Sequence, residues 1–591
     1  MKDFFKYVLA TVVGLILFFV VMGIFGVMSL VGMVASSEST KSVKDNSVFV
    51  LNLNKALDER SESNLMSKFT SGGEDALGLD QILSAIEKAK KNDKIKGIYI
   101  EAGGFSPDSY ASLQAIRRAL MDFKKAGKWI VSYGDTYTLP EYYLASTADK
   151  ILINPQGMID IHGMAAQPMF LKDLMAKVGV KMQLSKVGTY KSAPEMFTAD
   201  KMSDANREQV SVYVNGIWDN VVNDICLSRK ISKEQLNLYA DSLTTFKTTA
   251  EYLKMKLADK VVYADEVKNE VKTLLKLDKD DDINQLNLAD MGNVKKDKSE
   301  GEEIAVYYAF GNIVDEDSTD PMSPGEHLIV GKKVVKDLLE LADDDDVKAV
   351  VLRVNSGGGS AYASEQIWHA MKQLKAKKPV VVSMGGMAAS GGYYISSIAN
   401  YIVAEPTTLT GSIGIFGMFP DASELLTQKL GVKFDEVKTN ANATFGTRAR
   451  PFNANEMAML NTYIDRGYKL FRSRVAEGRK MPDEAVEKIA QGRVWLGQDA
   501  LRIKLVDELG GLDLAVAKAA QLAKLDKFHT EPYPAPGDWM DQLLDADKGE
   551  NYLNTKLKAT LGEFYEPFMM LKRMNYHSAI QARIPFVIRV E

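Results

Sequence analysis

Two side chains in this sequence have the types and surroundings needed for nucleophilic catalysis. Ser390 lies in Met387–Tyr394, a run rich in small residues that would let a substrate reach its hydroxyl. Lys191 lies in Gly188–Phe197, among apolar neighbours that would desolvate its amine, lower its pKa and let it act as a general base. Because a serine hydroxyl is a weak nucleophile until a positioned base removes its proton, the two residues together predict a Ser–Lys dyad.

A third segment, the glycine-rich Asn355–Ser360, could stabilise negative charge. Glycines lack the Cβ that would block a ligand, so backbone amides near Gly358 and Gly391 could face a developing oxyanion. Loss of one such donor lowers a reaction rate about 100- to 1000-fold. Each segment also has a purely structural interpretation. The loop could be a flexible turn, Ser390 could simply begin a close-packed helix, and Lys191 could be a solvated surface residue.

The chain contains an internal duplication that connects these segments. The block at 129–151 aligns without gaps with the block at 380–402, and 178–191 aligns with 430–443 at nearly the same spacing. In this alignment Leu139 stands where the second half has Ser390, and 440–444 in the second half lacks a lysine. The first half has lost the hydroxyl and the second half has lost the amine. This complementary loss predicts one site that uses both halves.

The elements that must position these residues follow an alternating pattern. Short β-branched runs such as Ile98–Ile100 and Val350–Val354 read as buried strands, and helical patterns such as Leu79–Lys91 and Ser364–Leu374 separate them. This alternation predicts an α/β fold with largely parallel strand pairing. The expected organisation is an N-terminal anchor at 1–46, a first domain at 47–291 with the lysine, a polar linker at 292–303, a second domain at 304–531 with the serine, and a tail at 532–591 of unassigned role.

The N-terminal segment predicts a membrane anchor. No charged residue occurs from Tyr7 to Ser37, and Val8–Val34 is densely apolar. A bilayer core needs about 20 apolar residues in a helix, whereas a cleaved signal peptide has an apolar region of about 7–15 residues. Small residues from Ala35 onward leave cleavage open. Lysines flank the span almost equally, so the short leading tail alone favours an inside N-terminus, with most of the chain outside the cytoplasm.

Composition excludes several other classes of function. Lys and Arg total 73 against 78 Asp and Glu, a net charge of −5, which argues against a nucleic-acid binder. A single cysteine, Cys226, allows no intramolecular disulfide, and the five histidines form no paired-ligand spacing. We therefore expect neither a metal site nor a cofactor.

Three motifs together resemble one known family. GTYKSAPEMFT, RVNSGGGS and ASGGYY, with the single anchor and the tandem halves, resemble the long, tandem-domain form of the signal peptide peptidase A family, also called protease IV. The resemblance implies duplicated Clp-protease- and crotonase-like domains preceded by one transmembrane helix. The site residues that it implies are the nucleophile Ser390, the general base Lys191, the oxyanion donors Gly358 and Gly391, and Ser412, which would hydrogen-bond the lysine amine. Gly357 departs from the family, which usually has proline there.

The resemblance also implies a biological setting. It indicates a dome-like homotetramer on the outer, periplasmic face of the bacterial inner membrane, which cleaves remnant signal peptides and other apolar peptides through an acyl-enzyme. Two alternatives stay open at this stage: a crotonase-like acyl-CoA enzyme and a non-catalytic membrane scaffold. A site outside the cytoplasm argues against the first, because CoA thioesters are cytoplasmic. No nucleic-acid partner is expected.

Overall fold

The computed structural model describes residues 41–60, 76–295, 300–316, 327–535 and 580–584, together with the isolated residues 6, 7, 14, 18, 21 and 22. The predicted anchor segment Val8–Val34 lies almost entirely outside these described residues. Within the part that is described, no helix is both long enough and apolar enough to cross a membrane.

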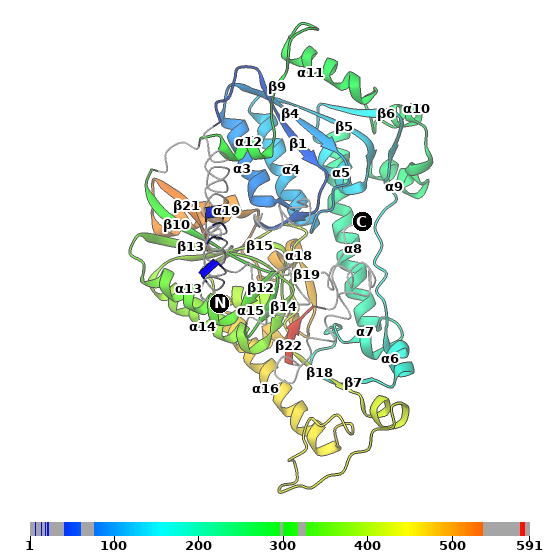
Figure 1. Ribbon diagram of the computed structural model, residues 1–591, viewed down its shortest axis with the longest axis vertical. Helices are drawn as coiled ribbons and strands as arrows, with labels where there is room; N and C mark the ends of the chain where they lie inside the picture. The colour runs from blue at the N-terminus through cyan, green and yellow to red at the C-terminus, as the bar shows by residue number, and fades with distance from the viewer. Residues whose placement is uncertain are drawn as a thin grey trace.

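The first half contains a parallel sheet, shown in blue and cyan at the top of Figure 1. Its strand order is β8-β6-β5-β4-β1-β9, and every pairing is parallel. The strands are β1 (Ser47–Leu53), β4 (Ile95–Ala102), β5 (Trp129–Tyr137), β6 (Lys150–Ile159), β8 (Lys260–Val261) and β9 (Asn284–Leu286). Helices α3 (Leu79–Lys91) and α4 (Tyr110–Lys125) contribute buried residues to the same apolar core.

The second half repeats this plan around a larger sheet of order β19-β17-β15-β13-β10-β21, in which β16 also pairs with β15, and β20 pairs with β16. The strands are β10 (Glu302–Phe310), β13 (Val347–Ser356), β15 (Val380–Ala389), β16 (Tyr401–Ala404), β17 (Leu409–Gly411), β19 (Val494–Leu496), β20 (Glu508–Leu509) and β21 (Phe528–Tyr533). Helices α13 (Gly331–Asp343), α14 (Ala361–Lys377) and α15 (Gly391–Ser396) join the main core, and α19 (Leu512–Ala523) joins a separate one. Except for β17 with β19, all pairings are parallel, which confirms the predicted α/β class.

A third sheet joins segments that are far apart in the sequence. Its order is β12 (Leu328–Val330), β11 (Asn312–Val314), β14 (Gly358–Ser360), β22 (Ile580–Arg583), β18 (Phe416–Asp421) and β7 (Lys181–Lys186). Strand β7 comes from the first half and pairs antiparallel with β18 of the second, from Phe416 opposite Lys186 to Asp421 opposite Lys181. The first half therefore contributes a strand to a sheet of the second half, shortly before the chain reaches Lys191.

Buried ion pairs also hold the halves together. Arg353 on β13 contacts both carboxylate oxygens of Glu59, at 2.6 and 3.3 Å, and the two side chains are 4% and 3% exposed. The amide of Asn355 donates to Glu59 at 3.0 Å and to Asp108 at 3.1 Å. Burial, with the nearby charge of Glu59, raises the pKa of Asp108 to about 6. Since Asn355 also accepts from the backbone amide of Met387 at 3.1 Å, this cluster fixes the glycine loop against β15.

Candidate active site

Ser390 stands at the turn between β15 and α15. Its backbone has φ 55° and ψ −115°, a conformation that costs a residue with a side chain about 1–3 kcal/mol unless its surroundings enforce it. Two hydrogen bonds enforce it here. The Ser390 amide donates to the Gly411 carbonyl, and the Ser390 carbonyl accepts from the Tyr394 amide, each at 2.8 Å. The strained residue is therefore held by one hydrogen bond to the end of β17 and by another to α15.

Lys191 from the first half contacts Ser390 directly. Its Nζ lies 2.7 Å from Ser390 Oγ and 3.1 Å from both the hydroxyl and the carbonyl oxygen of Ser412. All three residues are 0% exposed. Burial lowers the pKa of Lys191 well below its usual value, because the charged ammonium loses its hydration. Burial thereby favours the neutral amine, which is the form that can accept the proton of the Ser390 hydroxyl.

Two glycines of the second half make room for this lysine. A Cβ on Gly492 would lie 2.6 Å from both the backbone nitrogen and the Cβ of Lys191, closer than real Cβ contacts allow. A Cβ on Gly414 would lie 3.3 Å from Lys191 Cδ. The preceding residue, Tyr190, donates its amide to the Gln491 carbonyl at 2.8 Å. Sequence reasoning missed Gly492, because nothing in its local pattern records that a distant lysine packs on it.

A buried glutamine on α8 (Asp204–Arg229) connects the lysine segment to the second half. Gln209 is 1% exposed, and its side-chain nitrogen donates to the Tyr190 carbonyl at 3.1 Å and to Ser192 Oγ at 2.9 Å. Its side-chain oxygen accepts from the Val494 amide of β19 at 3.1 Å. Both residues that flank Lys191 are thereby held in place. Nothing in the local sequence pattern gave a sign of this role.

The glycine loop meets the start of α15 beside the serine. Gly358 has φ +100°, and a Cβ on it would lie 2.7 Å from the Gly391 nitrogen, so the backbones of the two predicted oxyanion donors are adjacent. The Gly358 amide donates to Ser356 Oγ at 3.1 Å, and an oxyanion would compete with that hydroxyl for it. Ser412, with φ 49°, is held by a hydrogen bond that its backbone amide donates to the Arg493 carbonyl at 2.7 Å. The structure thus brings all five predicted site residues together.

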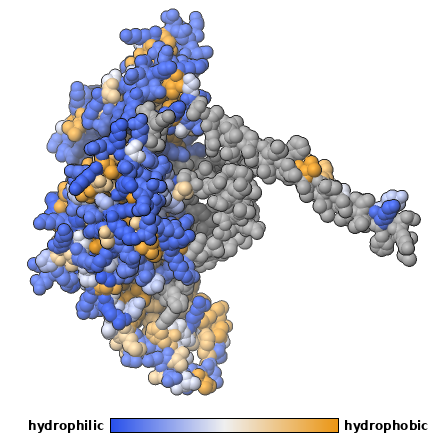
Figure 2. Space-filling view, turned by 90° about the vertical axis from the view of Figure 1, so that its left-hand side faces the viewer, coloured by the Kyte–Doolittle hydropathy of each residue, from blue (hydrophilic) through white to orange (hydrophobic). Residues whose placement is uncertain are grey.

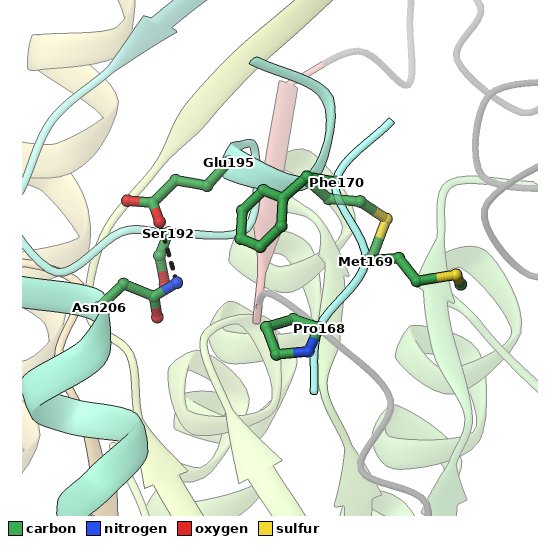
Figure 3. A pocket seen from close by; sticks show the side chains of 7 residues that line it. Pro168, Met169, Phe170, Ser192, Glu195 and Asn206 are labelled. Carbon is green, nitrogen blue, oxygen red and sulfur yellow. Dashed lines mark hydrogen bonds between the residues drawn. The ribbon is translucent and has the colours of Figure 1, made fainter. Parts of the chain in front are cut away.

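A small pocket lies beside the lysine segment (Figure 3). Its lining consists of Pro168, Met169, Phe170, Ser192, Glu195, Met196 and Asn206. The carboxylate of Glu195 is 6% exposed and accepts hydrogen bonds from the Ser203 amide and hydroxyl, at 3.1 and 2.6 Å, and from Asn206 at 2.9 Å. With these bonds made, Glu195 stabilises the fold around Ser192.

Comparison with known proteins agrees with this geometry. The model of "Peptidase family S49" matches residues 122–278 and 372–526, once in each half. The model of the Clp protease family matches residues 326–404, which contain β13, β14 and β15. The domains therefore have the Clp-protease-like α/β fold in tandem copies.

Full-length relatives extend the match across most of the chain. "Protease 4" of Salmonella typhi is 40% identical over 480 residues, covering 80% of this chain and 76% of that protein. "Protease 4" of Haemophilus influenzae is 38% identical over 461 residues, covering 75% and 72%. "Serine protease SPPA, chloroplastic" of Arabidopsis thaliana is 31% identical over 491 residues, covering 82% and 70%. With a buried serine and lysine in contact between the two matched copies, the chain belongs to peptidase family S49 and is a serine protease.

Proposed function

We propose that this protein is a membrane-anchored endopeptidase whose catalytic dyad is Ser390 and Lys191. The observation that carries the proposal is the 2.7 Å contact between a fully buried amine of the first half and a fully buried hydroxyl of the second. Burial supplies the neutral amine, and the turn at Ser390 supplies a hydroxyl held at one position. A base and a nucleophile within hydrogen-bond reach form the minimal arrangement for acyl transfer.

The reaction follows from these positions. Neutral Lys191 takes the Ser390 proton as Oγ attacks the peptide carbonyl carbon, and the amides of Gly358 and Gly391 stabilise the resulting oxyanion. The Lys191 ammonium then protonates the leaving amine, which leaves an acyl ester on Ser390. Water, deprotonated by the same amine, hydrolyses that ester. The oxygens of Ser412 orient the amine throughout, since they lie 3.1 Å from Nζ.

The substrates that we propose are remnant signal peptides and other apolar peptides. The resemblance of the Lys191, Gly358 and Ser390 motifs to the signal peptide peptidase A family supports this class. The uncharged run from Tyr7 to Ser37 supports a membrane anchor, and the same family resemblance supports the bacterial inner membrane with the bulk of the chain on the periplasmic side. An enzyme tethered there would meet apolar peptides left in the bilayer. The domain limits 47–291 and 304–531 belong to the same proposal.

We also propose a homo-oligomer, a tetramer by that resemblance. The duplication aligns β7 with 433–438 and β18 with 164–169, yet neither of these counterparts pairs with a strand in the described part of the chain. Val437 is 99% exposed and Phe434 is 50% exposed, and apolar residues gather at the lower end of the molecule in Figure 2. Pairing 433–438 of one copy with 164–169 of the next would repeat the β7–β18 junction between chains. Such head-to-tail contacts can close a ring.

Labelling of Ser390 tests the catalytic proposal. The purified protein is incubated with an apolar peptide that carries an acylating group, and the adduct is located by mass spectrometry. We expect the adduct on Ser390, and none in Lys191→Met, because the hydroxyl loses its base. A non-catalytic scaffold would give no adduct in either protein, and that result would reject the proposal. Bound CoA in the purified protein would instead favour the acyl-CoA alternative.

A further inference from the structure

Strands β13 and β15 lose their regular pairing shortly before the catalytic serine. On β15 the pairing with β13 stops at Met384 and resumes at Ala388, so residues 385–387 stand opposite the single residue Asn355. Irregularities of this kind are common beside active sites, where they redirect a side chain. This one ends three residues before Ser390. On its β13 side, the strand end that leads to the serine therefore needs a support other than the ladder.

The side chain of Asn355 provides that support. Its oxygen accepts a hydrogen bond from the Met387 amide at 3.1 Å. Its nitrogen donates to Glu59 at 3.0 Å and to Asp108 at 3.1 Å, and both carboxylates belong to the first half. The side-chain amide is fixed in this orientation, because the opposite one would set its oxygen against two carboxylates. Two acids of one half thus hold a backbone amide of the other.

The irregular segment of β15 packs closely against first-half residues. A Cβ on Gly385 would lie 2.9 Å from Glu59 Oε2. A Cβ on Gly386 would lie 2.5 Å from the side chain of Ser109, the N-cap of α4. Glycine permits these contacts because it has no Cβ. Apart from the lysine, the first half therefore reaches the strand end before the serine at a second place.

The backbone of Asn355 leads into the glycine loop. Its carbonyl accepts a hydrogen bond from the Gly311 amide at 3.0 Å, and the Gly311 carbonyl accepts one from the Ser356 hydroxyl at 2.7 Å. The same hydroxyl oxygen accepts from the Gly358 amide at 3.1 Å. A shift of Asn355 would therefore displace both the strand end before Ser390 and the proposed oxyanion donor Gly358.

The charge of Asp108 decides how firmly it holds Asn355. Burial, with the repulsion of Glu59, raises the pKa of Asp108 to about 6, whereas the Asn355 amide and Arg353 favour the charged carboxylate. A hydrogen bond to an ionised group is roughly twice as strong as one between neutral groups, so the hold weakens when Asp108 takes up a proton. Around Glu59 and Arg353 lie further titratable groups: Tyr308, Asp80 and Arg60.

We propose that Asn355 is a positioning residue for the proposed dyad, held by Glu59 and Asp108 of the first half, and that the hold is firmest when Asp108 is ionised. This inference rests on the proposed function. Asn355 acts through the strand end before Ser390 and through the loop that reaches Gly358. The first half then serves the site twice, once with the base and once with the two acids that keep the nucleophile and the oxyanion donor in place.

Asn355→Leu tests the positioning role, because leucine has a similar volume and makes none of the three side-chain hydrogen bonds. We expect kcat for an apolar fluorogenic peptide to fall about 100-fold, the cost of misplacing a catalytic group by about 1 Å, with little change in KM. Wild-type kcat in this variant, together with an inactive Ser390→Ala, would overturn the inference and leave the proposed function intact. A Ser390→Ala variant as active as wild type would reject the proposed function itself.

Asp108→Asn tests the same role in a variant that keeps a carbonyl oxygen for the Asn355 amide, and it decides the question if Asn355→Leu does not fold. In the wild type we expect kcat to drop several-fold as the pH falls through about 6, in addition to the pH dependence from Lys191. Asp108→Asn should show the lower kcat at neutral pH and no step near pH 6. The control Asp122→Asn, which removes a carboxylate of α4 that is 42% exposed, should keep the step. A step that persists in Asp108→Asn, or an unchanged kcat at neutral pH, would overturn the inference.

Discussion

In the first half a carboxylate accepts hydrogen bonds from successive amides of the loop after β4, whereas in the corresponding loop after β13 the Gly358 amide donates to a hydroxyl, Ser356 Oγ. Glu141 Oε1 accepts hydrogen bonds from three successive amides, those of Gly103, Gly104 and Phe105, at 3.1, 2.8 and 3.1 Å. The duplication aligns Glu141 with Gly392, where a Cβ would lie 2.6 Å from the Ser356 carbonyl oxygen. The same backbone plan thus holds a glutamate side chain in one copy and excludes a side chain in the other.

This difference shows how one ancestral site was divided. Three amides directed at one buried carboxylate oxygen show that the turn after this strand can bind negative charge. With Glu141 bound there and Leu139 in place of the serine, the first copy has a loop that only stabilises its fold. Its contribution to the proposed dyad is Lys191, which follows β7 in the chain. The second copy keeps the hydroxyl of Ser390, with the glycine loop beside it.

Removing either member of the dyad gives the largest expected effect. We expect Ser390→Ala and Lys191→Met each to lower kcat for an apolar peptide by about 10⁴-fold or more, and the double variant to lose little beyond that, since residues that act as a unit are not additive. Lys201→Met, which removes an exposed lysine of the first half, is the control and should stay near wild type. Most activity remaining in either single variant would mean that the halves do not share one site.

The next largest effect is expected from Gly492, the residue of the second half on which Lys191 packs. Gly492→Ala places a methyl group within 2.6 Å of the Lys191 backbone, so the amine must move. Misplacement of a catalytic group by about 1 Å costs roughly 100-fold, and we expect that loss in kcat with little change in KM. Gly431→Ala is the matched control, because Gly431 also has a positive φ, +70°, but nothing lies within 4 Å of its Cβ position. Equal losses in both variants would trace the effect to backbone strain alone.

Much of the fold was visible in the sequence for a local reason. Strands such as β13 and β15 are buried on both faces, so their apolar character is continuous and appears within a few residues. The dyad itself became visible by comparing the copies, because Leu139 and Ser390 occupy one aligned position. Neither inference needed knowledge of a contact between distant segments.

The features that the sequence did not reveal all depend on such contacts. Strand β7 was assigned to the first domain by chain continuity, yet it pairs with β18 of the second half. The packing of Gly492 on Lys191 and the insertion of β22 beside Gly358 join segments hundreds of residues apart. Glu141 reads as an ordinary first-turn acid, because its three amide donors lie in an earlier loop. The periodicity of apolar residues indicates which face of a segment is buried, but it does not indicate which distant segment packs against that face.

A smaller effect is expected from Glu141, on stability rather than chemistry. Glu141→Ala leaves the buried Phe105 amide and the more exposed Gly103 and Gly104 amides without their acceptor, and an unsatisfied buried group costs about 1–3 kcal/mol. We expect a total loss of about 3 kcal/mol and a fall in Tm of roughly 5–10 °C by calorimetry. Glu141→Gln keeps an acceptor oxygen and should lose less. Since Glu141 holds a loop of the first half and is not a member of the proposed dyad, kcat of the folded protein should not change, and a large fall in kcat would show that this loop is coupled to the site.

The smallest effect that we predict concerns the proton on Lys191. Because burial lowers the pKa of Lys191, kcat/KM should rise with pH through a midpoint well below 10.5, as the ammonium loses its proton. Between that midpoint and 10.5 the unfolded chain binds the extra proton, so stability also rises with pH.

The variant Ser412→Ala gives a more specific test of the Lys191 pKa. Serine and alanine both carry a Cβ, so the backbone strain at φ 49° stays the same. The hydroxyl oxygen accepts a hydrogen bond from Nζ at 3.1 Å, which favours the charged amine. Its removal should move the midpoint to still lower pH, while weaker orientation of the amine lowers kcat about 10-fold, less than the roughly 100-fold or more that loss of a whole general base costs. A midpoint that moves upward would mean that the hydroxyl donates to a neutral amine instead. A midpoint that does not move would show that the Ser412 carbonyl oxygen alone positions the lysine.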